Sequence, residues 1–205
     1  MAITWELLCN EALRKIGVKK RIGSAYEGSE VAKACLELFS QTRDELLQRE
    51  EWPFAMREVE LSIVGVSAPS PWTFEYGYPS DCLRIRYLQP DLTHADPFDP
   101  QPTLFLPWND QRPNPPIRAI LSDTAAAMLI YVGRITDPNT WDAAFTHAFI
   151  SSLAEHLVVP LAAAGLLPQE IAMAEMDRES AAATDDTAAP RRIVDMPRQA
   201  DGNQR

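Results

Sequence analysis

The sequence predicts an α+β fold, in which an antiparallel bundle of about four helices carries a small β-rich insertion and an extended C-terminal tail. Two observations predict it: helical periodicity recurs at both ends of the chain, and the middle alternates between apolar and polar residues and is rich in proline. With 205 residues, 46% of them hydrophobic, the chain is long enough for one domain with a core. That domain is expected at 1–184, with helices at 3–17, 29–52, 138–164 and 168–183, an insertion at 57–133 and a flexible tail at 185–205.

The helix expected at 29–52 is the spine of the domain. Its apolar side chains recur at steps of three or four residues, from Val31 through Cys35 to Leu46, which places them in one stripe. Ser29 suits the N-cap, and Pro53 ends the helix because a residue before proline avoids the α region. At 1.5 Å per residue such a helix is roughly 33 Å long, enough to cross a domain of this size.

The helix expected at 3–17 has the same kind of stripe, with Thr4 as a cap and Gly17 at its end. Basic side chains gather at its C-terminal side, namely Lys15, Lys19, Lys20 and Arg21. Two interpretations stay open. These charges match the negative end of the helix dipole, or they form a small basic contact point for a phosphate or an acidic partner.

The middle of the chain reads as strands and turns. Alternation predicts strands near 59–64, 72–76, 82–88, 103–106, 117–120 and 126–132. Seven of the 17 prolines lie between Pro97 and Pro116, so this stretch is neither a helix nor a central strand. It is expected either to project as an arm or to fold back on its own sheet. Its aromatic residues are Phe98, Phe105 and Trp108.

Helical periodicity returns after Asp137, a possible cap, and continues from Trp141 to Leu157. Pro160 should end or kink this helix, and Pro168 can open a fourth one. The helix exit at 52–54 should pack against the first and third helices. The expected core anchors are Trp5, Trp52, Phe54, Phe145 and Phe149.

Composition argues against several classes of protein. A net charge of −10 and a pI near 4.8 do not suit a broad basic surface that holds DNA. No apolar run reaches the roughly 18 to 20 residues of a membrane helix, and Glu6 interrupts what would be a secretory signal. The odd cysteines, Cys9, Cys35 and Cys82, suit free thiols in a reducing cytoplasm.

No motif for nucleotide binding, zinc proteolysis or serine hydrolysis is present. His156 lies on an apolar stripe, which favours a core histidine over a metal ligand. His94, Asp96 and Asp99 share the proline-rich stretch, and polar loop residues explain them better than a cation site does. We therefore expect no catalytic residue, no bound cofactor and no metal.

Several short pieces occur in an order that resembles the head-to-tail adaptor family of short-tailed bacteriophages, the tail tubular protein A type. The pieces are NEALRKIG at 10–17, SEVAKAC at 29–35, RDELL at 43–47, WPFA at 52–55, YPSDCLRI at 78–85 and RITDPNTWDAAF at 134–145. Their order and spacing span about residues 3–183, whereas the proline-rich stretch and the last 20 residues match no part of the pattern.

The resemblance implies a structural virion protein of the phage neck, made in the host bacterial cytoplasm, with no enzymatic activity. It implies a ring of about twelve copies that joins the portal to the tail nozzle and lets double-stranded DNA pass during ejection without sequence-specific binding. An acidic channel would repel phosphates, although the net charge also serves solubility. The resemblance directs the C-terminal segment to the portal, with the contact residues Arg191, Arg192, Ile193, Val194 and Met196. Phe98, Phe105 and Trp108 are the expected contacts to a neighbour or to the nozzle.

Two other functions are compatible with the sequence. One is a small metal-dependent hydrolase or nuclease accessory that uses His94, Asp96 and Asp99. The other is a helical module that binds one protein partner.

Overall fold

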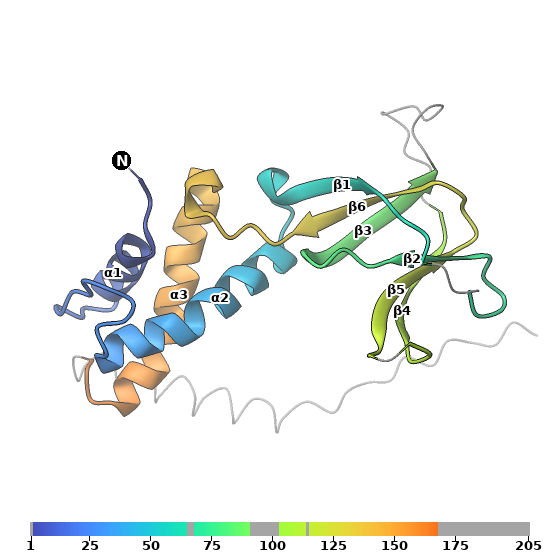
Figure 1. The fold of residues 1–205 in the computed structure, drawn as a ribbon. Coiled ribbons are helices and arrows are strands. Elements are labelled where there is room, and N and C mark those ends of the chain that lie inside the picture. Colours follow the sequence, from blue (N-terminus) through green and yellow to red (C-terminus); the bar gives the residue numbers. More distant parts are fainter. Residues whose placement is uncertain (1, 65–67, 91–102, 114, 168–205) are drawn as a thin grey trace, which may run out of the picture.

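The computed structural model describes residues 2–64, 68–90, 103–113 and 115–167. Over this range the chain is a mixed α+β fold, with three α-helices and two three-stranded antiparallel sheets, and the strands lie in the middle of the chain (Figure 1). The expected bundle of about four helices is therefore wrong. The fourth helix, expected at 168–183, and the tail at 185–205 lie outside the described residues.

Each helix begins at a side chain that accepts a hydrogen bond from the first turn. These helices are α1 (Trp5–Lys15), α2 (Glu30–Arg49) and α3 (Ala143–Ala163). Thr4 accepts from Leu7 N–H, and Ser29 from Ala32 N–H, as an N-cap should. The third helix starts later than expected. Asp137 caps a short 3-10 turn, η3 (Pro138–Thr140), and the cap of α3 is Asp142.

Two prolines act differently from one another. Pro53 lies beyond the end of α2 and opens the 3-10 turn η1 (Pro53–Ala55), as its fixed φ allows. Pro160 lies inside α3, which continues to Ala163, so of the two expected outcomes, an end or a kink, the helix end does not occur. The cost of the missing N–H is confined to the last turn of the helix, where α3 is about to stop.

A first hydrophobic core is formed by the three helices together with the nearest strand residues, Met56, Leu83 and Val132. At its centre, the ring of Phe145 lies 5.0 Å from Trp52, 5.1 Å from Phe54 and 4.9 Å from Trp141, all in edge-to-face contacts. Among the expected anchors, Phe145 and Phe149 are fully buried. Trp5, Trp52 and Phe54 are only partly buried, although they pack against this same core.

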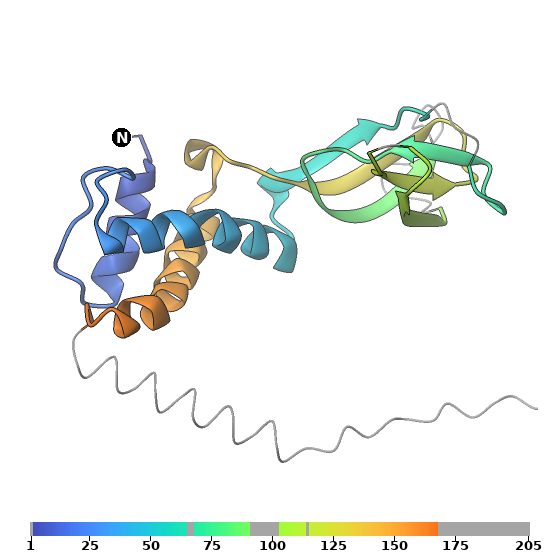
Figure 2. The same cartoon turned by 60° about the horizontal axis from the view of Figure 1, so that its bottom comes forward.

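The strands form two sheets. The first has the order β1-β6-β3, with β1 (Met56–Glu60), β6 (Ala127–Gly133) and β3 (Cys82–Pro90). The second has the order β2-β5-β4, with β2 (Phe74–Gly77), β5 (Ile117–Ser122) and β4 (Phe105–Asp110). Figures 1 and 2 show the helices at one end of an elongated molecule and both sheets at the other.

A second hydrophobic core is built from the two sheets, with Tyr76, Leu88, Ile120 and Leu129 among its buried residues. The region expected as a small insertion thus has a core of its own, which explains why a helical bundle does not describe the fold. The chain leaves the helices through β1 and returns through β6, and these two strands are hydrogen-bonded neighbours.

The described part of the proline-rich stretch, 103–113, lies against its own sheet. β4 runs from Phe105 through Pro107 to Asp110 and pairs with β5, while Phe105 packs against the second core. Of the two alternatives for this stretch, the structure shows the folded-back one over these residues. Pro107 is tolerated because β4 is an edge strand, where a missing N–H need not break a ladder.

The central position of Phe145 generates a prediction. Phe145→Ala should lower the free energy of unfolding by about 3–5 kcal/mol, because it removes a fully buried ring from the aromatic cluster. The matched control is Leu36→Ala on α2, where the side chain is exposed and the change should stay within about 0.5 kcal/mol. Urea denaturation measures both, and equal losses would contradict the packing described above.

Candidate functional site

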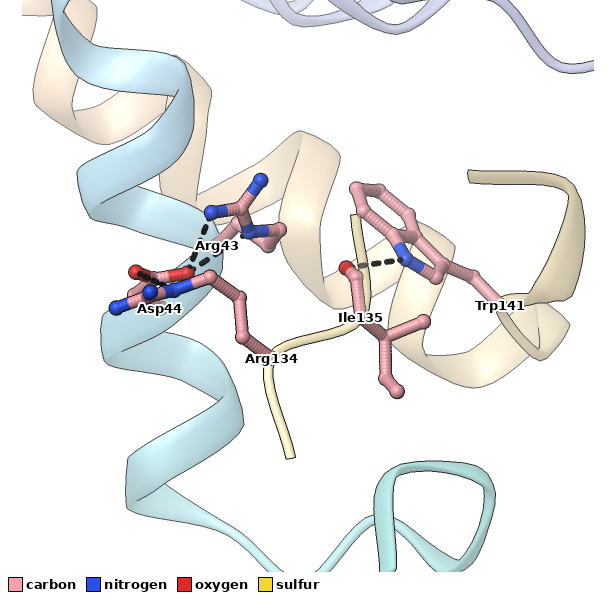
Figure 3. A network of polar contacts seen from close by, with 5 residues as sticks. All are labelled: Arg43, Asp44, Arg134, Ile135 and Trp141. Atoms are coloured by element: carbon pink, nitrogen blue, oxygen red, sulfur yellow. Dashed lines mark hydrogen bonds and ion pairs between the residues drawn. The ribbon is translucent and has the colours of Figure 1, made fainter. Parts of the chain in front are cut away.

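Charged side chains gather where α2 meets the return of the chain from the sheets (Figure 3). Asp44 Oδ1 accepts from Arg43 Nε at 2.8 Å, and Arg43 Nη2 lies 2.7 Å from the same oxygen. Asp44 Oδ2 accepts from Arg134 Nε at 2.8 Å. One carboxylate therefore binds a guanidinium from its own helix and another from the segment after β6.

Further polar contacts extend this junction along the first sheet. Arg84 Nη1 donates to the carbonyl oxygen of Gln48 at 2.9 Å, and Arg86 forms an ion pair with Glu51. Arg134 N–H donates to the carbonyl oxygen of Asp81 at 2.7 Å. Arginine side chains thus join α2 and the residues just after it to β3 and to Arg134, while the backbone bond joins Arg134 to the residue before β3.

The carboxylate of Asp81 also serves this region. It accepts from Tyr131 Oη at 3.0 Å and lies 3.5 Å from Arg57 Nε. Burial, and then the contact with Asp81, raises the pKa of Tyr131 to about 12, so the phenol remains a donor near neutral pH. A Cβ at Gly133 would lie 2.6 Å from Arg57 Cδ, so glycine leaves room for the Arg57 side chain to cross the end of β6.

The helical end of the molecule has a basic cavity of about 470 Å³. Asn10 shapes it by bonding twice to the backbone of Ile22, donating at 2.9 Å and accepting at 2.8 Å. Four of its nine lining residues are basic, although the surface that the nine expose into it is mainly apolar: Leu7, Asn10, Glu11, Arg14, Gly17, Val18, Lys19, Lys20 and Arg21. Glu11 is ion-paired with Arg14, which leaves the balance of charge positive. Such a concave surface suits an anionic group.

A second charged cluster is buried in the other sheet. Arg112 Nε donates to Asp110 Oδ1 at 2.7 Å, and Arg112 Nη2 donates to Glu75 Oε2. Both carboxylates are about 1% exposed. Within the described contacts, Glu75 Oε1 and Asp110 Oδ2 have no hydrogen-bond partner. Arg112 holds the pKa of Asp110 below its usual value near 3.8, because it stabilises the charged form.

Beside this cluster, β4 exposes large apolar side chains. Leu104 is 84% exposed, Leu106 41% and Trp108 39%. They are two residues apart, so they point to the same face of the strand. An exposed apolar row of this kind is typical of a contact surface.

The structure separates the residues expected at a neighbour or nozzle contact. Trp108 lies in the exposed row on β4, Phe105 packs against the core built from the two sheets, and Phe98 lies outside the described residues. The expected portal contacts, Arg191, Arg192, Ile193, Val194 and Met196, also lie outside them.

Of the two histidines discussed above, the structure describes His156 but not His94. His156 Nδ1 lies 2.8 Å from Thr42 Oγ1, and Nε2 lies 3.9 Å from Glu45, so this side chain links α3 to α2. His94, Asp96 and Asp99 lie outside the described residues. Among the residues that are described, no group of three or more potential metal ligands comes together.

Sequence reasoning missed both charged clusters. The sequence pattern places Arg43 and Asp44 in the helix expected at 29–52, Glu75 in the strand expected at 72–76, and Asp110 and Arg112 in the proline-rich stretch, and it does not indicate that they meet. The available signal was a charged residue inside an alternating apolar strand, as at Glu75.

All three cysteines are buried free thiols, and no described helix is long and apolar enough to cross a membrane.

No family model matches the chain, and no curated protein matches it.

The junction generates a prediction about Asp44. Asp44→Ala should cost about 3 kcal/mol of unfolding free energy, because it leaves the guanidinium of Arg43 unpaired, with only 9% of that side chain exposed. Arg134→Ala should cost about 1 kcal/mol or less, because that side chain is 41% exposed. Urea denaturation of the two variants compares them directly. Equal costs would mean that Arg43 does not depend on Asp44.

The second cluster generates a prediction about pH. The pKa of Asp110 is lowered in the folded state, so its charge stabilises the fold above about pH 3.8 and stops doing so as pH falls through the folded pKa. Asp110→Asn should therefore be less stable than the wild type at about pH 6, and the gap should shrink at about pH 3. Thermal unfolding at both values measures the gap, with Glu58→Gln on the exposed side of β1 as control. A gap that does not change with pH would contradict this assignment.

Proposed function

We propose that this protein is a structural head-to-tail connector of a short-tailed bacteriophage, which assembles as a ring between the portal and the tail nozzle. The proposal rests on the ordered sequence pieces that resemble the adaptor family. The observation that supports it best is the arrangement of two hydrophobic cores in series, with a charged junction between the helices and the first sheet.

A connector has to contact different partners at different places. This chain has two separate candidate surfaces, the basic cavity beside α1 and the exposed apolar row on β4. Figure 1 places α1 and β4 at opposite ends of the elongated molecule. Surfaces so far apart can bind two neighbours at once without competing for space.

The charged junction suits a protein in which the angle between the helices and the first sheet must stay fixed. Ion pairs and hydrogen bonds from Arg84, Arg86 and Arg134 fasten the first sheet and its exit to α2. Directional contacts of this kind fix the angle between two units, which apolar packing alone does less well. A ring subunit needs such a fixed angle, because closure depends on the same rotation at every interface.

The charge of the chain suits a DNA channel. At −10 per copy, a ring of about twelve copies would carry about −120, and a lumen of that sign repels phosphates and lets the duplex slide. The basic cavity is then an exception within an acidic protein. We assign it to an acidic surface of the portal.

The test is to mix the purified protein with the portal of the same phage and to measure mass by light scattering. We expect a complex that contains a ring of about twelve copies, about 275 kDa from 22.9 kDa each. If no complex forms with that portal, the connector proposal is wrong.

The cavity is tested in the same experiment. Lys19→Glu with Lys20→Glu should weaken portal binding at least about tenfold, because it reverses two charges of the lining. Lys33→Glu with Arg49→Glu is the matched control, since it makes the same charge change at exposed positions of α2. Equal weakening by the two pairs would show a general charge effect and remove the cavity from the contact.

A further inference from the structure

The edge of the second sheet is incompletely paired. β2 has β5 on one side and, on the other, the segment around Ile63, which bridges to Tyr76. In the part of the chain that the structure describes, β4 pairs only with β5. Among the described residues the second edge of β4 is therefore unpaired, and an unpaired edge is a template for another strand.

Side chains along this edge have a distinct order. Leu104, just before β4, and Leu106 and Trp108 within it are exposed at every second position, and Asp110 follows at the same spacing but is buried, with about 1% exposed. On the neighbouring strand, Leu106 pairs with Leu121 and Trp108 with Ala119, both of which are buried. The exposed apolar row therefore lies at the margin of a buried apolar part of the sheet.

The acidic end of the row has an excess of negative charge. Asp110 and Glu75 are two carboxyl groups bound to one guanidinium, that of Arg112. One oxygen of each carboxylate has no hydrogen-bond partner among the described residues. A further basic side chain is the chemistry that this end of the row would attract.

A segment of the C-terminal tail has the complementary order. Residues 191–196 read RRIVDM and are bounded by Pro190 and Pro197. In an extended strand, Arg192, Val194 and Met196 lie on one face. The segment has six residues, as β4 has, and its basic residue comes first where the acid of β4 comes last.

We propose that residues 191–196 of one copy add to β4 of a second copy as an antiparallel strand. In the matching register, Met196 lies opposite Leu106, Val194 opposite Trp108, and Arg192 opposite Asp110. Apolar groups then meet apolar groups, and the arginine meets the excess negative charge. Parallel pairing would place Arg192 opposite Leu106, and the carboxylates of Asp110 and Glu75 would then gain no basic partner from the tail.

The choice of a second copy rests on the proposed ring. A tail that binds the next subunit makes a heterologous contact, and repetition of that contact closes a ring. The 23 residues 168–190 span at most about 80 Å when fully extended, which sets the limit of how far the segment can reach. Pro107 has no N–H, so the ladder on β4 lacks one donor and the side-chain row must supply the selectivity.

Complementation of two full-length variants tests the proposal. The edge variant is Leu106→Thr with Trp108→Thr, which keeps its tail. The tail variant is Ile193→Asp with Val194→Asp, which keeps its edge. The wild type should self-associate in sedimentation over a wide concentration range, and each variant alone should do so at least about tenfold more weakly.

Mixing the two variants should restore a heterodimer of about 46 kDa, twice 22.9 kDa, and nothing larger. Only one working tail and one working edge are then available, so the chain of contacts cannot continue. If the mixture remains monomeric, or if either variant alone associates like the wild type, the proposal is wrong. Protection of 191–196 from hydrogen exchange in a wild-type monomer would also overturn it, because the tail would then bind its own copy.

Charge is tested separately. Arg191→Glu with Arg192→Glu should weaken self-association at least about tenfold, whereas the matched pair Arg198→Glu with Arg205→Glu should not. Equal effects would overturn the pairing of Arg192 with the acidic end.

None of these measurements uses the portal, so failure here leaves the connector proposal standing. Failure to bind the portal leaves this strand pairing standing. Protection of the tail only when the portal is present would instead assign the segment to the portal.

Discussion

The antiparallel pairing of β1 with β6 is the constraint that organises this molecule. The chain leaves α2 and enters β1, builds both sheets, and returns to α3 through β6. Because entry and exit are hydrogen-bonded from Met56–Val132 to Glu60–Met128, the two crossings form one stem. A long excursion between two helices thereby becomes a structured arm, and both of its ends pack at the base against the helical core.

The stem alone does not set the angle of the arm, and the charged junction adds that restraint. Asp44 ties α2 to the segment after β6, while arginines on β3 reach the end of the same helix. The aromatic cluster around Phe145 then fills the apolar side of the base. Packing supplies most of the stability there, and the directional bonds supply orientation. This division suits a protein that has to hold neighbours at fixed angles.

The candidate contact surfaces follow from the two cores. Each core buries most of the apolar side chains of its own helices or strands. The two candidate contact surfaces are formed by side chains that stay exposed at either end of the molecule. At the helical end this is a basic cavity, shaped by Asn10 and the backbone of Ile22. At the arm it is the row that begins at Leu104 on the edge of the second sheet. A candidate contact surface at each end is what the proposed connector requires.

The sequence by itself determined the local elements. Periods of 3.6 and 2 located three helices and most strands, and side chains at Thr4 and Ser29 marked helix starts, because these signals depend on residues only a few positions apart. The tertiary structure decided that the strands form two sheets with their own core, that β4 pairs on one side only within the described ranges, and that Glu75 meets Arg112 and Asp44 meets Arg134. Periodicity shows which residues share a face, but it does not show which strand becomes the neighbour. These contacts join residues 37 and 90 positions apart, and only the folded chain brings such residues together.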